Sequence, residues 1–159
     1  MKKKRWLILF FFAASSLLIY SSCHKEGQNV SAVSANGGTT SHYNGADCMS
    51  CHKKSGKGAG GGWFVVAGSI YQPDQITPNP NATIYLYTAQ NGGGTLAGTI
   101  QADALGNFFS TNSIDFGNGL YPAVQTSAGT THYMNSFTVV GDCNGCHTSG
   151  SQAGRVFGD

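Results

Sequence analysis

The central part of the chain alternates between apolar and polar residues in short runs. Residues 82–89, Ala-Thr-Ile-Tyr-Leu-Tyr-Thr-Ala, show the two-residue period that is typical of a strand with one buried face. Other runs rich in aromatic and β-branched residues are separated by segments of Gly, Pro, Asn and Asp, which favour turns. The six expected strands are 63–71, 82–89, 95–102, 107–111, 120–126 and 132–140. Short strands and turns at this spacing predict a mainly β fold, a small antiparallel β-sandwich.

Three pieces of this region resemble a known family of sandwiches. They are the strand at 65–71, Asn-Ala-Thr-Ile-Tyr-Leu at 81–86, and Asp-Ala-Leu-Gly-Asn-Phe at 103–108. Together they resemble the regulatory-like module of carboxypeptidases and other prealbumin-like sandwiches, over about half of the mature chain. The resemblance implies a prealbumin-like scaffold or binding accessory, without catalytic activity of its own.

The first 22 residues have the pattern of an export signal. Met-Lys-Lys-Lys-Arg precedes an apolar run at 6–20, which is short for a membrane span and typical of a signal h-region. Ser21 and Ser22 lead into Cys23, a position similar to the lipidation site of bacterial lipoproteins. The similarity implies a lipid anchor on Cys23 at the outer membrane of the cell envelope, on its periplasmic or cell-surface face. The alternative is an ordinary cleaved signal that leaves Cys23 as a free thiol.

Two short segments on either side of the expected sandwich carry the chemistry of the chain. Cys-Met-Ser-Cys-His at 48–52 and Cys-Asn-Gly-Cys-His at 143–147 contain four of the five cysteines. Two thiols at this spacing can each add to one vinyl group of a haem, and the histidine that follows then reaches the iron. Both segments resemble the haem-attachment motif of c-type cytochromes, which implies two covalently attached haems (haem c). The residues concerned are Cys48, Cys51, Cys143 and Cys146 for attachment, with His52 and His147 on the irons.

Other uses of the paired cysteines are open at the level of the sequence. A thioredoxin-like dithiol normally occurs beside a βαβ pattern, and no helix–strand alternation is found in this chain. Four cysteines can form one tetrahedral zinc site as two knuckles, although the histidine after each pair is then unexplained. Two disulfides suit an oxidising compartment, but such short rings remove little entropy from the unfolded chain. These alternatives define a rival function, a surface lipoprotein binding module whose cysteine pairs hold zinc or disulfides.

Three histidines remain for the sixth positions of the two irons: His24, His42 and His132. His24 adjoins the expected anchor, so His42 and His132, each upstream of a motif, are the expected additional metal ligands. Met134 competes with His132 for the second iron. Because His/Met ligation raises the reduction potential relative to His/His, this choice decides which partners the protein can serve.

Composition and charge narrow the function further. The chain has 159 residues, of which 10% are charged and 23 are glycine, so it can bury only one modest core. The formal charge is +2, but beyond residue 22 there are five cations and seven acids, and 5 − 7 gives −2. With this balance no basic face is expected that could neutralise the phosphates of a nucleic acid, which argues against a nucleic-acid partner. No acid–base pair outside the motifs indicates substrate turnover, so an electron carrier is expected rather than an enzyme.

The chain is expected to divide into five parts. They are a lipoprotein signal peptide at 1–22, a flexible tether at 23–41, a first haem-binding segment at 42–62, the β-sandwich at 63–140 and a second haem-binding segment at 141–159. An even number of antiparallel crossings places both loop-rich haem segments at the same end of the sandwich. The sequence thus predicts an exported c-type cytochrome lipoprotein that passes single electrons between membrane or periplasmic and extracellular partners. Those partners are redox proteins and the membrane itself, with self-association left open.

Overall fold

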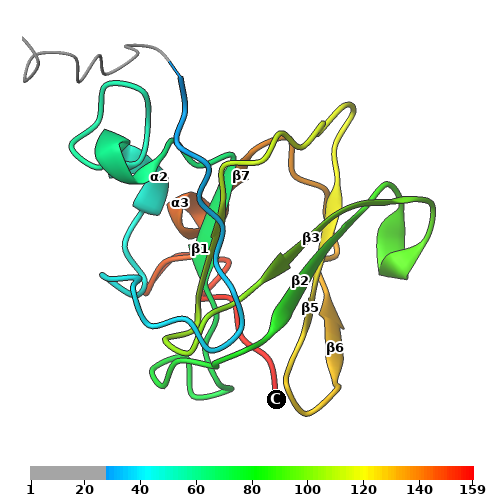
Figure 1. The fold of residues 1–159 in the computed structure, drawn as a ribbon. Helices are drawn as coiled ribbons and strands as arrows, with labels where there is room; N and C mark the ends of the chain where they lie inside the picture. The colour runs from blue at the N-terminus through cyan, green and yellow to red at the C-terminus, as the bar shows by residue number, and fades with distance from the viewer. Residues whose placement is uncertain (1–27) are drawn as a thin grey trace, which may run out of the picture.

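The computed structural model describes residues 28–159, which form two packed β-sheets (Figure 1). The first sheet has the order β4–β1–β7, with β1 at Val66–Ser69, β4 at Asn107–Ser110 and β7 at Gly141–Asp142. The second has the order β3–β2–β5–β6, with β2 at Thr83–Tyr87, β3 at Leu96–Gln101, β5 at Tyr121–Gln125 and β6 at Thr131–Tyr133. The mainly β sandwich predicted from the sequence is therefore confirmed.

The core lies between the two sheets. In β2 the alternating pattern buries Ile84 and Leu86, while the residues between them remain partly exposed on the outer face. The first sheet contributes Val66 and Phe108 to the same apolar cluster. All four residues of β1 are buried, because chain segments cover this strand on its outer face as well as its inner one. The segments on that outer face include the two cysteine motifs.

The last expected strand, 132–140, differs from the structure. β6 ends at Tyr133, and pairing resumes only where Thr138 lies opposite Leu120. Between these points four residues, 134–137, lie opposite two residues of β5, 121–122. Such a bulge breaks the ladder and bends the strand. Beyond it the chain leaves the second sheet and forms β7, which pairs parallel with β1. The sandwich is therefore antiparallel except for this one short pair among the described strands.

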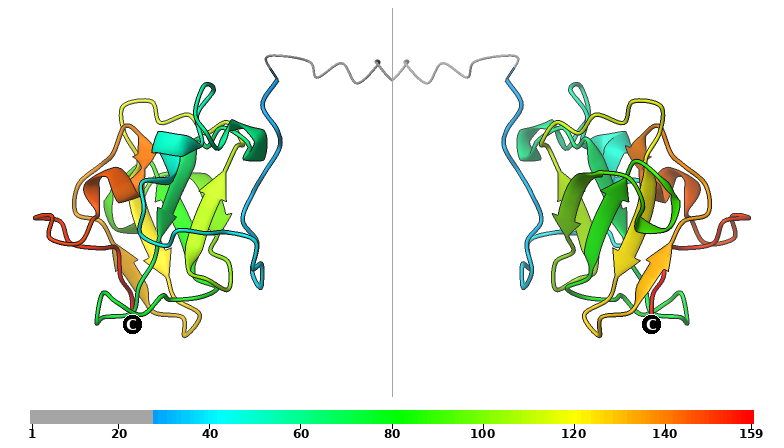
Figure 2. Two further views of the ribbon diagram at one scale, coloured as in Figure 1. Left: turned by 90° about the vertical axis from the view of Figure 1, so that its left-hand side faces the viewer. Right: turned by 90° about the vertical axis from the view of Figure 1, so that its right-hand side faces the viewer.

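The described part of the expected tether, 28–41, is bonded to the first sheet. Ser34 N donates to Phe109 O at 2.9 Å, and Thr111 N donates to Ala32 O at 2.9 Å. Figure 2 shows this N-terminal segment running down the outside of the sandwich. It satisfies backbone groups that an uncovered edge of β4 would expose.

The helices of the described chain are single turns, among them α2 at Cys48–Cys51 and α3 at Cys143–Cys146. Within residues 28–159, no helix is long and apolar enough to cross a membrane. The expected signal peptide at 1–22 and the expected lipidation residue Cys23 lie outside the described residues.

Candidate functional site

The two cysteine motifs fold in the same way. Each forms one helical turn that begins at its first cysteine and ends at its second. An aspartate caps each turn: Asp47 Oδ1 accepts from Ser50 N at 2.8 Å, and Asp142 Oδ1 accepts from Gly145 N at 3.1 Å. A side-chain oxygen at this position satisfies an amide that has no partner within the helix. Because residues three apart share one face of a turn, the two thiols of each pair lie on the same side.

The histidine after each turn is held by a backbone carbonyl further along the chain. His52 Nδ1 lies 3.2 Å from Gly62 O, and His147 Nδ1 lies 3.0 Å from Gly154 O. A carbonyl oxygen only accepts hydrogen bonds, so Nδ1 carries the proton and donates in both rings. Nε2 then keeps its lone pair, and no hydrogen bond within residues 28–159 engages it in either ring. Metal-binding histidines are typically oriented by a hydrogen bond of this kind.

The His52 ring packs between an aromatic ring and the glycine-rich residues 58–62. Phe64 stacks on it with the ring centroids 4.1 Å apart and the planes 7° from parallel. A Cβ atom at Gly58 would lie 2.9 or 3.0 Å from three atoms of the His52 ring, and one at Gly61 would lie 3.1 Å from Cε1. Position 58 therefore requires glycine because the imidazole approaches so closely. The glycine-rich residues 58–62 thus shape the surroundings of His52.

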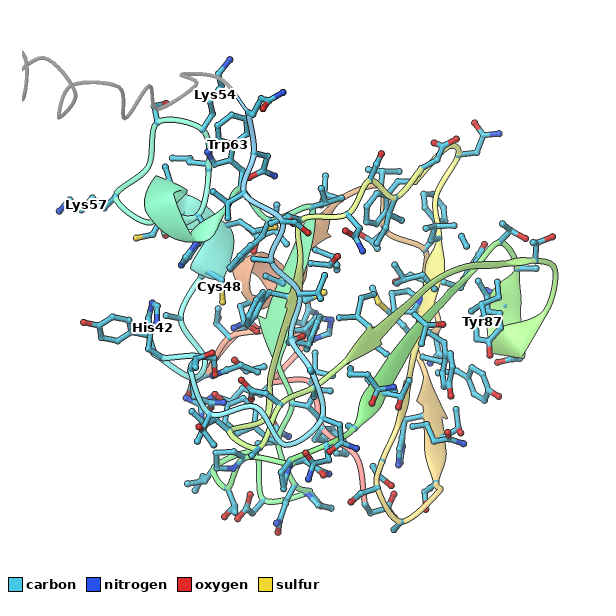
Figure 3. All side chains as sticks on the ribbon, viewed as in Figure 1. His42, Cys48, Lys54, Lys57, Trp63 and Tyr87 are labelled. Atoms are coloured by element: carbon cyan, nitrogen blue, oxygen red, sulfur yellow. The ribbon has the colours of Figure 1, made fainter. Side chains whose placement is uncertain are left out.

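His42 lies close to His52, with the ring centroids 5.8 Å apart and the planes inclined by 38°. Figure 3 shows His42 and Cys48 on the same flank of the molecule. The structure thus brings the His42 ring next to the first motif.

An apolar cavity of about 290 Å³ adjoins the second motif. Cys143, Cys146 and His147 line it, and so do His132 and Met134. Most of its remaining wall is apolar and comes from both sheets and the C-terminal segment, including Ile84, Phe108, Pro122, Val124, Val156 and Phe157. One cavity therefore joins the second motif to both side chains that the sequence suggests as its further ligand.

His132 differs from Met134 in that it already has a partner. Its Nε2 atom forms an ion pair with the carboxylate of Asp159, the last residue of the chain, and both side chains are partly exposed. Phe157 lies beside the imidazole, with the ring centroids 6.3 Å apart. Binding of a metal through His132 Nε2 would therefore require this ion pair to open.

The two motifs lie side by side and are joined by Asn144, whose side chain is 1% exposed. Its Nδ2 donates to Ala46 O, just ahead of the first motif, at 2.8 Å. Its Oδ1 accepts from Ser69 N at 3.0 Å, so the amide continues the contact with β1 after β7 has ended. The two motifs therefore lie together, but over the outer face of β1 and not at one end of the sandwich as predicted. The prediction assumed that the last strand runs antiparallel to the first, whereas β7 pairs parallel with β1 (Figure 1).

Burial sets the ionisation of the first cysteine in each motif. It raises the pKa of the Cys48 thiol to about 11, and the Asp47 carboxylate acts in the same direction. It raises the pKa of the Cys143 thiol to about 12, again with an adjacent carboxylate, that of Asp142, adding to the effect. Reactive dithiols have lowered pKa values. The surroundings of Cys48 and Cys143 therefore disfavour the thiolate that a redox dithiol needs.

The four motif cysteines are free thiols, and Cys51 and Cys146 are exposed. Across residues 28–159, no group of three or more His, Cys, Asp or Glu side chains is arranged to hold a metal ion. The arrangement thus lends no support to one zinc site shared by two knuckles. Each motif instead offers its own pair of thiols and its own imidazole Nε2.

Several residues that support the motifs were not predicted from the sequence. The caps Asp47 and Asp142 had a visible signal, because both motifs can be written Asp-Cys-x-x-Cys-His. Asn144 and the carbonyl groups of Gly62 and Gly154 had none, since their roles arise only from the fold.

Comparison of the chain with models of protein families, with curated proteins and with solved structures gave no match. Its function must therefore be inferred from its own residues and their geometry.

Proposed function

We propose that this chain is an exported two-haem c-type cytochrome that carries single electrons. The observation that supports this most directly is the repeated local geometry of the motifs. In each, paired thiols on a capped turn are followed by an imidazole with Nδ1 hydrogen-bonded and Nε2 free. A haem bound there supplies a one-electron iron couple. A zinc knuckle or a disulfide pair gives no reason for an oriented histidine after both cysteine pairs.

Each cysteine pair would hold one haem through two thioether bonds. Each bond would result from addition of one cysteine S–H across a vinyl group, so no oxidant would be needed. Protonated thiols, as burial favours at Cys48 and Cys143, are the starting form for this addition. His52 and His147 would give Nε2 to the two irons, while the carbonyl groups on their Nδ1 atoms fix the rings.

The residues around each motif favour six-coordinate irons, with a protein ligand in both axial positions. His42, whose ring lies close to that of His52, would supply the sixth ligand of the first iron. At the second site we assign this role to His132, with Met134 in the same cavity as the competing candidate. The mostly apolar wall of that cavity would disfavour water at the second site. Closed, six-coordinate irons suit electron transfer better than the turnover of a substrate.

The proposal includes a lipid anchor on Cys23 and a location at the outer membrane of the cell envelope. It is supported by the signal pattern at 1–22 and the cysteine that follows. The partners would be redox proteins of the membrane or periplasm and an acceptor outside the cell. Cys23→Ala should move the protein from the membrane fraction to the soluble fraction, and unchanged fractionation would place the anchor elsewhere.

Paired serine variants test haem attachment at each motif separately. The protein is produced in a host with a haem-attachment system, and covalent haem is measured after denaturation. We expect Cys48→Ser/Cys51→Ser and Cys143→Ser/Cys146→Ser each to retain half of the haem absorbance of the wild type. Zinc is measured in the same samples, so a wild type with bound zinc and no haem would favour the rival binding module.

A further inference from the structure

All lysines of the described chain lie in one short loop. Lys53, Lys54 and Lys57 follow directly after His52, and residues 28–159 contain no other lysine. All three side chains are exposed. None of them takes part in an ion pair within residues 28–159, where the one salt bridge involves His132. The loop therefore presents three positive charges to its surroundings.

The rest of the described chain has the opposite charge. Residues 28–159 contain three lysines and one arginine against six aspartates, and 4 − 6 gives −2. From residue 28 to residue 73 the sequence contains one acidic residue, Asp47. The molecule thus has a negative net charge and one positive loop. A negatively charged surface will therefore attract the loop and orient the molecule.

A tryptophan and the start of the described chain lie beside this loop. Lys54 Nζ is 5.7 Å from the centroid of the Trp63 ring. Trp63 N donates to Asn29 Oδ1 at 2.6 Å, and Asn29 Nδ2 donates to Trp63 O at 2.8 Å. Figure 3 shows Lys54, Lys57 and Trp63 gathered at the same end of the molecule. We refer to the three lysines and Trp63 as the lysine–tryptophan patch.

The position of Asn29 ties this patch to the proposed anchor. Asn29 lies six positions after Cys23, and six extended residues span at most about 20 Å. A lipid on Cys23 therefore holds Asn29, and the Trp63 backbone bonded to it, within about 20 Å of the bilayer surface. Lysine and tryptophan are the side chains that suit this zone, because ammonium groups attract anionic headgroups and indole rings prefer the interface.

We infer that the lysine–tryptophan patch lies on an anionic lipid surface, so that the first motif faces the membrane. The inference depends on the lipid anchor that is part of the proposed function. An acidic redox protein is the other partner whose charge is complementary to that of the loop. The membrane is favoured because Asn29, which is bonded to Trp63, follows the proposed anchor on Cys23 by only six positions.

Lysine footprinting on vesicles tests this orientation. The lipidated, haem-loaded protein is added to preformed phosphatidylcholine vesicles with or without about 30% phosphatidylglycerol, floated, and treated with a membrane-impermeant amine-acylating reagent. Each lysine near an anionic surface contributes about a fivefold gain in binding, so we expect Lys53, Lys54 and Lys57 to be acylated at least about fivefold more slowly on the anionic vesicles. High salt should abolish the difference, because it screens the attraction.

The outcomes separate this inference from the function on which it depends. Protein that floats but is acylated equally on both vesicles has its loop turned away from the bilayer, as a surface for an acidic protein would be, and overturns the inference. Protein that does not float lacks the anchor, which also overturns it. Covalent haem measured in the same sample decides the cytochrome proposal independently.

A charge-relocated variant provides the matched control. Lys53→Gln/Lys54→Gln combined with Ser127→Lys/Ala128→Lys keeps the net charge and moves two positive charges to the exposed β5–β6 turn, at the other end of the molecule (Figure 1). Lys57 should then be acylated at the same rate on both vesicles. Undiminished protection of Lys57 in this variant would show that the lysines do not set the orientation and would overturn the inference.

Discussion

Replacing Asn144 with alanine tests how the two motif segments are held together. The side chain is 1% exposed, accepts from Ser69 N at 3.0 Å, and donates to Ala46 O at 2.8 Å and to Ser69 Oγ at 3.1 Å. Ser69 is itself 0% exposed. The substitution therefore leaves a buried amide of β1 without an acceptor and removes the direct bond between the segments.

The size of the effect follows from these bonds. An unsatisfied buried amide costs about 1–3 kcal/mol, and the bonds made by Nδ2 contribute about 0.5–1.5 kcal/mol each. We expect the free energy of unfolding to fall by about 2–6 kcal/mol in Asn144→Ala, a large share of the ~5–15 kcal/mol typical of a domain. The melting temperature should fall by roughly 10 °C.

Guanidinium titration of the haem-loaded protein, followed by circular dichroism, measures this loss. Asn118→Ala is the matched control, because Asn118 is an exposed asparagine in the segment between β4 and β5. Its free energy of unfolding should change by no more than about 0.5 kcal/mol. A loss in Asn144→Ala as small as in the control would refute the role given to Asn144.

Three further predictions concern the motif surroundings. Gly58→Ala places a methyl group 2.9 or 3.0 Å from three atoms of the His52 ring, whereas nothing lies within 4 Å of a Cβ at Gly60. We therefore expect Gly58→Ala to shift the midpoint potential of one haem and Gly60→Ala to shift neither; equal titrations would contradict this. Asp142→Asn keeps the cap and removes a carboxyl group whose pKa is raised, first by burial and then by a neighbouring carboxylate. The folded wild type binds this proton more tightly than the unfolded chain, so its stability falls as pH rises from the ordinary aspartate pKa through the raised one. The variant should be more stable than the wild type near neutral pH and lose that advantage at about pH 3, whereas a gain independent of pH would rule out the linkage. His132→Ala should convert one of two low-spin iron signals in low-temperature electron paramagnetic resonance to high spin; two unchanged signals would remove His132 from the ligand set.

Local sequence patterns predicted most strands of the sandwich well. The alternation at 82–89 gave β2 at Thr83–Tyr87, and the runs at 95–102 and 107–111 gave β3 and β4 with ends shifted by one residue or so. These elements are predictable because one buried face imposes a two-residue period on each strand. The paired motifs were equally visible, since their spacing is local.

Contacts between distant residues were not predictable in the same way. The expected strand at 132–140 was broken by a bulge whose pairing depends on Leu120 and Thr138. His132 was proposed from its position near the second motif, but its pairing with Asp159 spans 27 residues and has no local signal. The same holds for the bond from Asn144 to Ala46, which spans 98 residues. Such contacts form only when the sheets pack together. The local pattern of apolar and polar residues therefore does not predict them.

The central claim, two covalently bound haems, is tested most directly by the intact mass of the denatured wild-type protein. The protein should be produced with a haem-attachment system and extracted with acidic acetone, which removes haem that is not covalently bound. The account predicts a polypeptide heavier by two haem groups, with its visible absorption retained after extraction. A polypeptide that carries no added mass and loses all visible absorption would contradict it.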